Sequence, residues 1–167
     1  EPDLCQIPVP SLPGGRTSVL AGKLIVLDPG HGEFQGGTND PGAVNSGLGR
    51  NERDEVRRQA DIVKTNLVRK GATVYIVEND SAKTLSEIGS EGRGADCFIS
   101  LHLNAFNRQA QGHEVFVHSQ GTAADERLAT LINQELAAVL PITNRGVKRA
   151  GLGVLRGVPL PVPAVLT

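Results

Sequence analysis

Short apolar runs alternate along this chain with longer segments in which apolar residues recur every three or four positions. The runs are bounded by glycine, proline or polar residues, a pattern typical of buried strands. They predict strands at residues 24–27, 72–77, 96–101 and 114–118, and two short apolar pieces at 153–155 and 164–166 complete the set.

The longer segments have the period of amphipathic helices. Apolar residues between 56 and 67 follow one another at spacings of four, three and four, which predicts a helix over about 53–70 that Gly71 closes. A second apolar stripe runs over 128–139 and stops before a proline. Between them, a short helix is expected around 84–88.

This order of strands and helices predicts an α/β fold with a single twisted, mostly parallel or mixed sheet and helices on both faces. Ligands of such sheets bind at the C-terminal ends of strands, so the positions after Leu27, Leu101 and Leu166 are the first to inspect. Residues 1–22 are rich in proline and glycine and predict a linker or lead-in, suited to the junction with a preceding domain. The folded domain is therefore expected over 23–167.

Composition excludes several classes of function. The 167 residues are 39% hydrophobic, enough for one domain with a packed core. Lys and Arg number 17 against 18 Asp and Glu, and this net charge of -1 argues against a nucleic-acid-binding protein. The apolar runs are too short to span a membrane.

The two cysteines do not make a disulfide framework. Cys97 lies in an apolar run and is interpreted as a buried thiol, although a bridge to Cys5 would suit an oxidising compartment. The chain opens at Glu1 and contains no Met, so we expect its natural start to lie further upstream, and no signal peptide is visible.

Two histidines follow predicted strands and are the first candidates for chemistry. His31 stands between two glycines after the first strand, and His102 follows the third. Two imidazoles and one carboxylate form a catalytic zinc site whose fourth position is open to water. The carboxylate is expected from Glu52, Asp54 or Glu55 at the start of the first long helix, and physical reasoning alone does not separate these three.

Several separated motifs resemble the zinc-dependent N-acetylmuramoyl-L-alanine amidases, the peptidoglycan hydrolases of bacteria and their phages. The motifs are LDPGHG at 27–32, DPGA at 40–43, NERD at 51–54, FISLHLNA at 98–105, GHEV at 112–115 and RGVK at 145–148. The resemblance runs from about residue 23 to the last residue, with the motifs in order.

The resemblance implies a site and a reaction. Its ligands to one zinc ion correspond to His31, Glu52 and His102, and this choice of Glu52 rests on the family. Family members cleave the amide between the lactyl group of N-acetylmuramic acid and L-alanine of the stem peptide. Peptidoglycan as substrate implies a periplasmic or extracellular protein, either a host autolysin or a phage endolysin.

The general base is harder to assign. In the family it is a Glu that follows a short C-terminal strand, and here it is expected directly after Thr167, as though the domain were cut short. Glu114 is a weaker substitute in the fourth strand. Asn104 is a candidate to orient a substrate carbonyl, or else caps a turn. A basic cluster at 145–149 suits an anionic stem peptide or a solvated face.

Three other functions stay open on this evidence. The first is a zinc-bound but inactive peptidoglycan-binding module, favoured if no Glu follows Thr167. The second is a zinc peptidase that acts on free stem peptides. The third is a protein without metal, in which His31 and His102 are purely structural.

Overall fold

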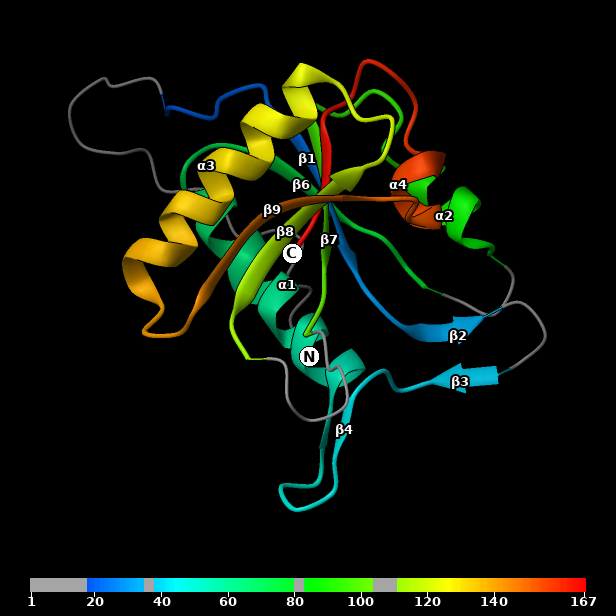
Figure 1. Ribbon diagram of the computed structural model, residues 1–167. Helices are drawn as coiled ribbons and strands as arrows, with labels where there is room; N and C mark the ends of the chain where they lie inside the picture. Colours follow the sequence, from blue (N-terminus) through cyan, green and yellow to red (C-terminus); the bar gives the residue numbers. More distant parts are fainter. Residues whose placement is uncertain (1–17, 35–37, 80–82, 104–110) are drawn as a thin grey trace.

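A six-stranded mixed sheet forms the centre of the computed structural model, which describes residues 18–34, 38–79, 83–103 and 111–167 (Figure 1). In spatial order its strands are β6 (Thr73–Ile76), β1 (Leu24–Pro29), β7 (Cys97–Leu101), β10 (Ala164–Leu166), β8 (His113–His118) and β9 (Asn144–Ala150). Neighbouring strands pair in parallel except β10 with β8, which pair antiparallel. The predicted mostly parallel or mixed sheet is confirmed.

Helices cover both faces of this sheet, as the sequence predicted. Helices α1 (Glu52–Arg69) and α3 (Ala123–Val139) lie on one face, and α2 (Leu85–Ser90) and α4 (Gly153–Gly157) lie on the other (Figure 1). The alternation of side chains along each strand explains the division, because successive residues point to opposite faces. In β1, Leu27 packs with α1, whereas Val26 belongs to the core beneath α2 and α4.

Polar caps fix where the helices begin. The side chain of Asn51 accepts a hydrogen bond from the Asp54 N–H at 2.9 Å, which starts α1 at Glu52. Thr122 and Asp125 form a reciprocal capping box at the start of α3. The same Asp125 carboxylate accepts the Ala164 N–H at 2.7 Å and so ties α3 to β10.

The glycine-rich segment between β1 and α1 contains two small hairpins. Strand β2 (Gly32–Phe34) pairs with β3 (Thr38–Asp40), and β4 (Val44–Asn45) pairs with β5 (Arg50–Asn51). These strands have two or three residues each, too few to show a period in the sequence. Their consequence is functional, since the hairpins bring the segment 40–43 back beside the start of α1.

Two predictions near the C-terminus were wrong. Residues 153–155 read as a strand, but Gly153–Gly157 is one turn of helix, too short for a helical period to appear. Strand β9 was missed because Asn144–Ala150 carries three basic residues and little apolar side chain. Such a composition suits an edge strand, where charges oppose pairing with other chains.

Three sequence expectations, on membrane spans, on the cysteines and on the lead-in, can be compared with the structure. Among the described residues, the structure contains no helix with the length and apolar character needed to cross a membrane. Burial, with a smaller contribution from the charge of Asp96, raises the pKa of the Cys97 thiol to about 11. Cys5 and most of the predicted lead-in fall on residues 1–17, outside the described residues.

Candidate metal centre

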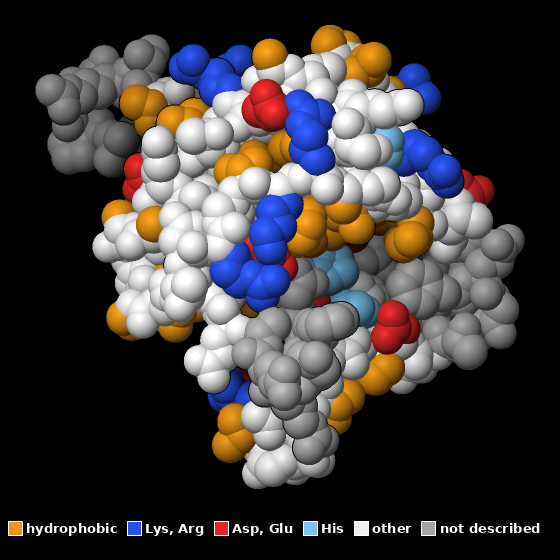
Figure 2. Space-filling model, in the orientation of Figure 1, with side chains coloured by type: hydrophobic (Ala, Val, Ile, Leu, Met, Phe, Trp, Pro, Cys, Tyr) orange, Lys and Arg blue, Asp and Glu red, His pale blue; other side chains and the backbone are white. Residues whose placement is uncertain are grey.

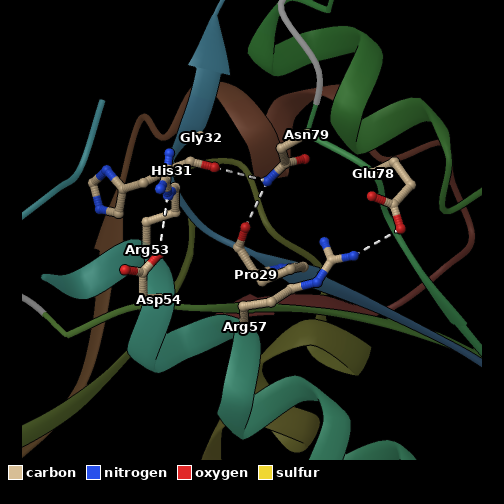
Figure 3. A pocket seen from close by; sticks show the side chains of 8 residues that line it. All are labelled: Pro29, His31, Gly32, Arg53, Asp54, Arg57, Glu78 and Asn79. Carbon is tan, nitrogen blue, oxygen red and sulfur yellow. Dashed lines mark hydrogen bonds and ion pairs between the residues drawn. The ribbon is translucent and has the colours of Figure 1, made fainter. Parts of the chain in front are cut away.

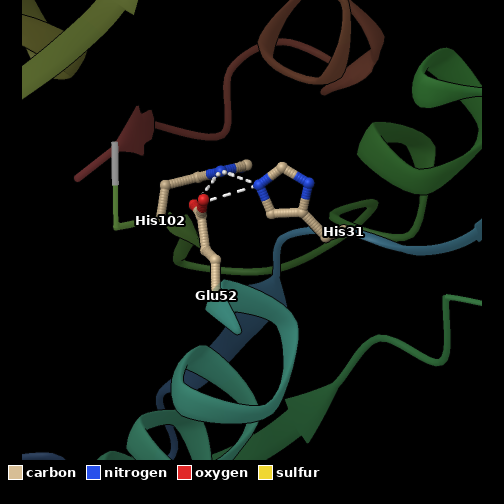
Figure 4. A group of neighbouring side chains, drawn as sticks. All are labelled: His31, Glu52 and His102. Carbon is tan, nitrogen blue, oxygen red and sulfur yellow. Dashed lines mark hydrogen bonds and ion pairs between the residues drawn. The ribbon is translucent and has the colours of Figure 1, made fainter. Parts of the chain in front are cut away.

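Three side chains from separate elements converge at the C-terminal edge of the sheet (Figure 4). His31 follows β1, Glu52 is the first residue of α1, and His102 follows β7. The Glu52 Oε1 atom lies 3.0 Å from His31 Nε2 and 3.1 Å from His102 Nδ1, and these two nitrogens are 3.2 Å apart. The structure therefore brings together the three residues that the sequence singled out.

The spacing of these three atoms suits a metal ion. Ligand atoms around a tetrahedral zinc ion, each about 2.0–2.1 Å from the metal, lie roughly 3.3 Å from one another. The three observed separations are within 0.3 Å of that value. Two imidazole nitrogens and one carboxylate oxygen are also the donor set of catalytic zinc sites that keep an open position. The group is thus suited to hold a divalent cation.

The structure separates Glu52 from the two other acidic candidates. Glu52 is buried, and its two oxygens accept the backbone N–H groups of Leu103 at 2.7 Å and Ala43 at 3.0 Å. Asp54 instead accepts a hydrogen bond from the helix cap Asn51, and Glu55 pairs with Arg50 of β5 and Arg58 of α1. Only Glu52 among these three is directed at the histidines.

A second carboxylate fixes the orientation of His31. Asp40, at the end of β3, lies 3.0 Å from His31 Nδ1 through Oδ2, while its Oδ1 accepts the Gly42 N–H at 2.8 Å. A donor contact at Nδ1 leaves Nε2 as the atom that faces Glu52. Sequence analysis assigned no role to Asp40, although its place in the DPGA motif was a usable signal.

Within the group of His31, Glu52 and His102, the contacts favour a protonated His31 and an ionised Glu52. The contact with Glu52 is the main cause that raises the pKa of His31 to about 9; partial burial opposes the shift, and Asp40 adds to it. Burial alone would raise the pKa of Glu52, but hydrogen bonds from His102, His31 and two backbone N–H groups hold it well below its usual range. A cation that enters therefore meets an ionised carboxylate and displaces a proton from His31.

Two glycines make room for this convergence. A Cβ atom on Gly30 would lie 2.3 Å from His102 Cε1, and one on Gly42 would lie 2.7 Å from His31 Cδ2. Gly42 also has a φ of 65°, in the left-handed region that side chains avoid. Each imidazole thus lies so close to the backbone of a glycine that a side chain at that position would collide with it.

Buried polar groups hold the strand ends behind the histidines. Asp28 accepts hydrogen bonds from Ser100 Oγ at 2.6 Å and from the Asn79 side-chain amide at 3.1 Å, which joins β1 to β7. The Asn79 amide also donates to the carbonyls of Pro29 and His31 (Figure 3). These bonds stabilise the backbone at His31, whose φ of 70° is unusual for a residue with a side chain.

The group of His31, Glu52 and His102, which could hold a metal ion, opens onto a pocket of about 670 Å³, within the range of small-molecule sites. Its lining comprises His31, Gly42, Ala43, Glu52, His102, Glu114, Phe116, Arg145, Leu152 and Leu166. Figure 2 shows histidine side chains on this face with basic side chains beside them and hydrophobic side chains along one rim. A ligand in the pocket would meet the metal group, an apolar wall and one arginine.

The other sequence candidates have different positions. Glu114 lines the pocket, but its carboxylate pairs with Arg145 and Lys148. Asn104 lies outside the described residues. His113 and His118, five residues apart on β8, lie on opposite faces of that strand, and neither joins the group of His31, Glu52 and His102 among the residues that the structure describes.

Comparison with known proteins gives close agreement with this architecture. Residues 25–167 match the sequence profile of a family described as N-acetylmuramoyl-L-alanine amidase. The chain is 34% identical over 153 residues to the N-acetylmuramoyl-L-alanine amidase LytC of Bacillus subtilis, covering 89% of this chain and 29% of LytC. It is 33% identical over 150 residues to the probable cell wall amidase LytH of Staphylococcus epidermidis, covering 88% of this chain and 47% of LytH.

Solved structures agree with the sequence relatives. An N-acetylmuramoyl-L-alanine amidase from Clostridium difficile 630 superposes with a TM-score of 0.75 at 25% identity, covering 86% of this chain and 77% of that one. The amidase AmiC2 of Nostoc punctiforme gives a TM-score of 0.71 at 25% identity, covering 88% and 78%. The chain spans less than half the length of the curated relatives it matches. It belongs to the N-acetylmuramoyl-L-alanine amidase family.

Proposed function

We propose that this chain is the catalytic domain of a zinc-dependent peptidoglycan amidase. Its reaction is hydrolysis of the amide between the lactyl group of N-acetylmuramic acid and L-alanine of the stem peptide. The observation that carries the proposal is the convergence of His31, Glu52 and His102 at the floor of an open pocket. The family profile over residues 25–167 supports the same reaction.

Zinc is held in this proposal by His31 Nε2, Glu52 Oε1 and His102 Nδ1. When bound, it polarises the amide carbonyl and activates water for attack. The protein's own contribution is to fix these three donors. The backbone N–H groups of Leu103 and Ala43 hold the Glu52 carboxylate, and Asp40 sets the ring of His31, so little reorganisation is needed when substrate binds.

In this proposal the general base is the glutamate that the family resemblance implies directly after Thr167. The Thr167 carbonyl accepts the His102 N–H at 3.0 Å, and its own N–H donates to Ser100 at 2.9 Å. A side chain on the next residue would therefore leave the sheet at the edge where His102 stands. Glu114 is less suited to accept a proton, because two basic side chains already engage its carboxylate.

The site of action follows from the substrate. LytC is named as an N-acetylmuramoyl-L-alanine amidase and LytH as a probable cell wall amidase. By the same chemistry, this protein acts on the cell envelope, in the periplasm or outside the cell. Host autolysin and phage endolysin are both consistent with the geometry of the metal centre.

The test is digestion of purified sacculi by the zinc-loaded protein, followed by mass spectrometry of the products. The amidase predicts stem peptides that begin with a free L-alanine amino group, together with glycan strands whose N-acetylmuramic acid residues carry free lactyl carboxylates. Chelation should stop the release and added zinc should restore it. Cleavage of free stem peptides alone would favour the peptidase, and zinc binding without any product would favour the binding module.

Asp40 provides a prediction about the support of the metal. Replacing Asp40 with alanine should weaken zinc binding by about tenfold to a hundredfold, the usual effect of losing a partner of a metal-bound histidine. The physical reason is that His31 Nδ1 loses the carboxylate at 3.0 Å that orients its ring. Competition titration with a zinc chelator measures the change.

The matched control for Asp40 is Asp61→Ala. Asp61 is exposed in the middle of α1, and its replacement removes the same charge far from the histidines. Equal zinc affinities for the two variants would show that Asp40 does not support the metal centre.

A further inference from the structure

The basic cluster on β9 separates in the structure into three residues with different surroundings. Arg149 is anchored away from the metal pocket: its guanidinium pairs with Glu126 and donates to the carbonyls of Ser119 and Gly121, both at 3.2 Å. These bonds tie the edge strand to the turn before α3. Arg149 thus has a structural role.

Lys148 is also engaged. Its ammonium pairs with Glu114 and lies 5.9 Å from the centre of the Phe116 ring, a cation–π arrangement. Among the described residues, the pocket lining includes neither Lys148 nor Arg149. Of the three basic residues, only Arg145 lines the pocket that holds His31, Glu52 and His102.

Arg145 presents the part of its side chain that binds anions. Its contact with Glu114 uses Nε, which lies 3.2 Å from Glu114 Oε2. Within the described part of the chain, its two terminal nitrogens donate no hydrogen bond to the protein. The side chain is 32% exposed, so these nitrogens are accessible while the stem is held. A guanidinium in this state is suited to a planar, two-oxygen ligand such as a carboxylate.

The charges around Arg145 also favour an anionic ligand. The carboxylate of Glu114 faces two cations, Arg145 and Lys148, so one positive charge in this group of three is unbalanced. Phe116, Leu152 and Leu166 supply an apolar wall to the same pocket, and a charge pair formed beside apolar groups is stronger than one surrounded by water. An anionic group on a bound ligand would balance the group.

We infer that Arg145 is a specificity-determining residue that binds a free carboxylate of the stem peptide while the scissile amide lies at the metal centre. The inference rests on the proposed amidase function, because that function supplies the substrate. The ligand chemistry is narrow: a carboxylate is bound, and the corresponding carboxamide, which lacks the charge and one acceptor oxygen, is disfavoured.

The test compares two substrates that differ only in this group. They are the γ-methylamides of N-acetylmuramoyl-L-alanyl-D-glutamate and N-acetylmuramoyl-L-alanyl-D-isoglutamine. The α-carboxylate is then the only free carboxylate of the first, and the second has a carboxamide in its place. For the wild-type protein, kcat/KM and the equilibrium affinity should both favour the acid by roughly tenfold or more, the usual size of a charge-assisted contact. In Arg145→Gln the ratio of kcat/KM for the acid to kcat/KM for the amide should fall to near one. The fall should come from a lower kcat/KM for the acid, while the value for the amide stays unchanged.

Two further variants sharpen the comparison. Arg145→Lys keeps the charge but lacks the planar fork, so it should retain only part of the preference. Arg127→Gln removes an arginine exposed on α3 and absent from the pocket lining, and it should keep the full preference. Zinc content and melting temperature of every variant show whether the metal centre and the fold are intact.

The outcomes distinguish this inference from the proposed function. The role of Arg145 would be overturned if wild type and Arg145→Gln preferred the acid equally, or if wild type showed no preference. Hydrolysis of both substrates would still support the proposed amidase function in either case. A wild-type protein that hydrolyses neither substrate would overturn the amidase. In that case the ratio of the two affinities, with and without Arg145, still decides whether the pocket recognises a carboxylate.

Discussion

Replacing His31 with alanine is expected to abolish stoichiometric zinc binding and to lower amidase activity by more than about a hundredfold. Loss of a residue that only orients a metal ligand usually lowers affinity or activity by about a hundredfold at most. His31 supplies one of three donors, and the other two, on Glu52 and His102, cannot close a tetrahedral site. The variant also leaves the buried Glu52 carboxylate with fewer hydrogen-bond donors. Metal analysis of the dialysed protein, together with product release from sacculi, measures both effects.

The control for His31 is His118→Ala. His118 lies partly buried on β8, outside the metal group, so its replacement should leave one zinc per chain. Circular dichroism on both variants separates loss of metal from loss of fold. A His31→Ala protein that keeps one zinc and its activity would remove the basis of the metalloamidase, and the two histidines would then be structural.

The histidines could be predicted from the sequence because their position follows from the fold class. A strand end in an α/β sheet is set by short apolar runs, and these are local features. The choice among Glu52, Asp54 and Glu55 was different. It depends on where α1 begins, and the Asn51 cap fixes that by a bond to Asp54, which directs Asp54 outward and leaves Glu52 at the inner side of the first turn.

The residues that surround the three candidate ligands were less predictable, because their contacts depend on how distant segments of the chain fold together. Asp40 reaches His31 only because the β2–β3 hairpin folds back, and these hairpins leave no period in the sequence. Arg145 reaches the pocket from β9, an edge strand whose basic composition concealed it. Both residues stood in motifs shared with the family, but a motif alone does not state what its residues contact.

The other large effect is expected at a residue with no side chain. Replacing Gly30 with alanine should lower zinc affinity by about a hundredfold or more, beyond the effect of losing a supporting partner. The new Cβ would lie 2.3 Å from His102 Cε1 and 2.4 Å from Nε2, closer than such atoms approach. The backbone has little freedom to withdraw, because the Gly30 N–H donates to the Leu101 carbonyl at 2.9 Å. The His102 ring must therefore move.

Gly151→Ala is the matched control, since a Cβ there meets nothing within 4 Å and should leave zinc binding unchanged. Calorimetric zinc titration and thermal unfolding of both variants measure the two effects. The three atoms nearest to the new Cβ all belong to the His102 ring and none to a core side chain, so we expect the variant to keep the fold while losing the metal. Full zinc affinity in Gly30→Ala would mean that His102 binds metal from another ring position, and that the 3.2 Å approach of the two imidazole nitrogens is not required.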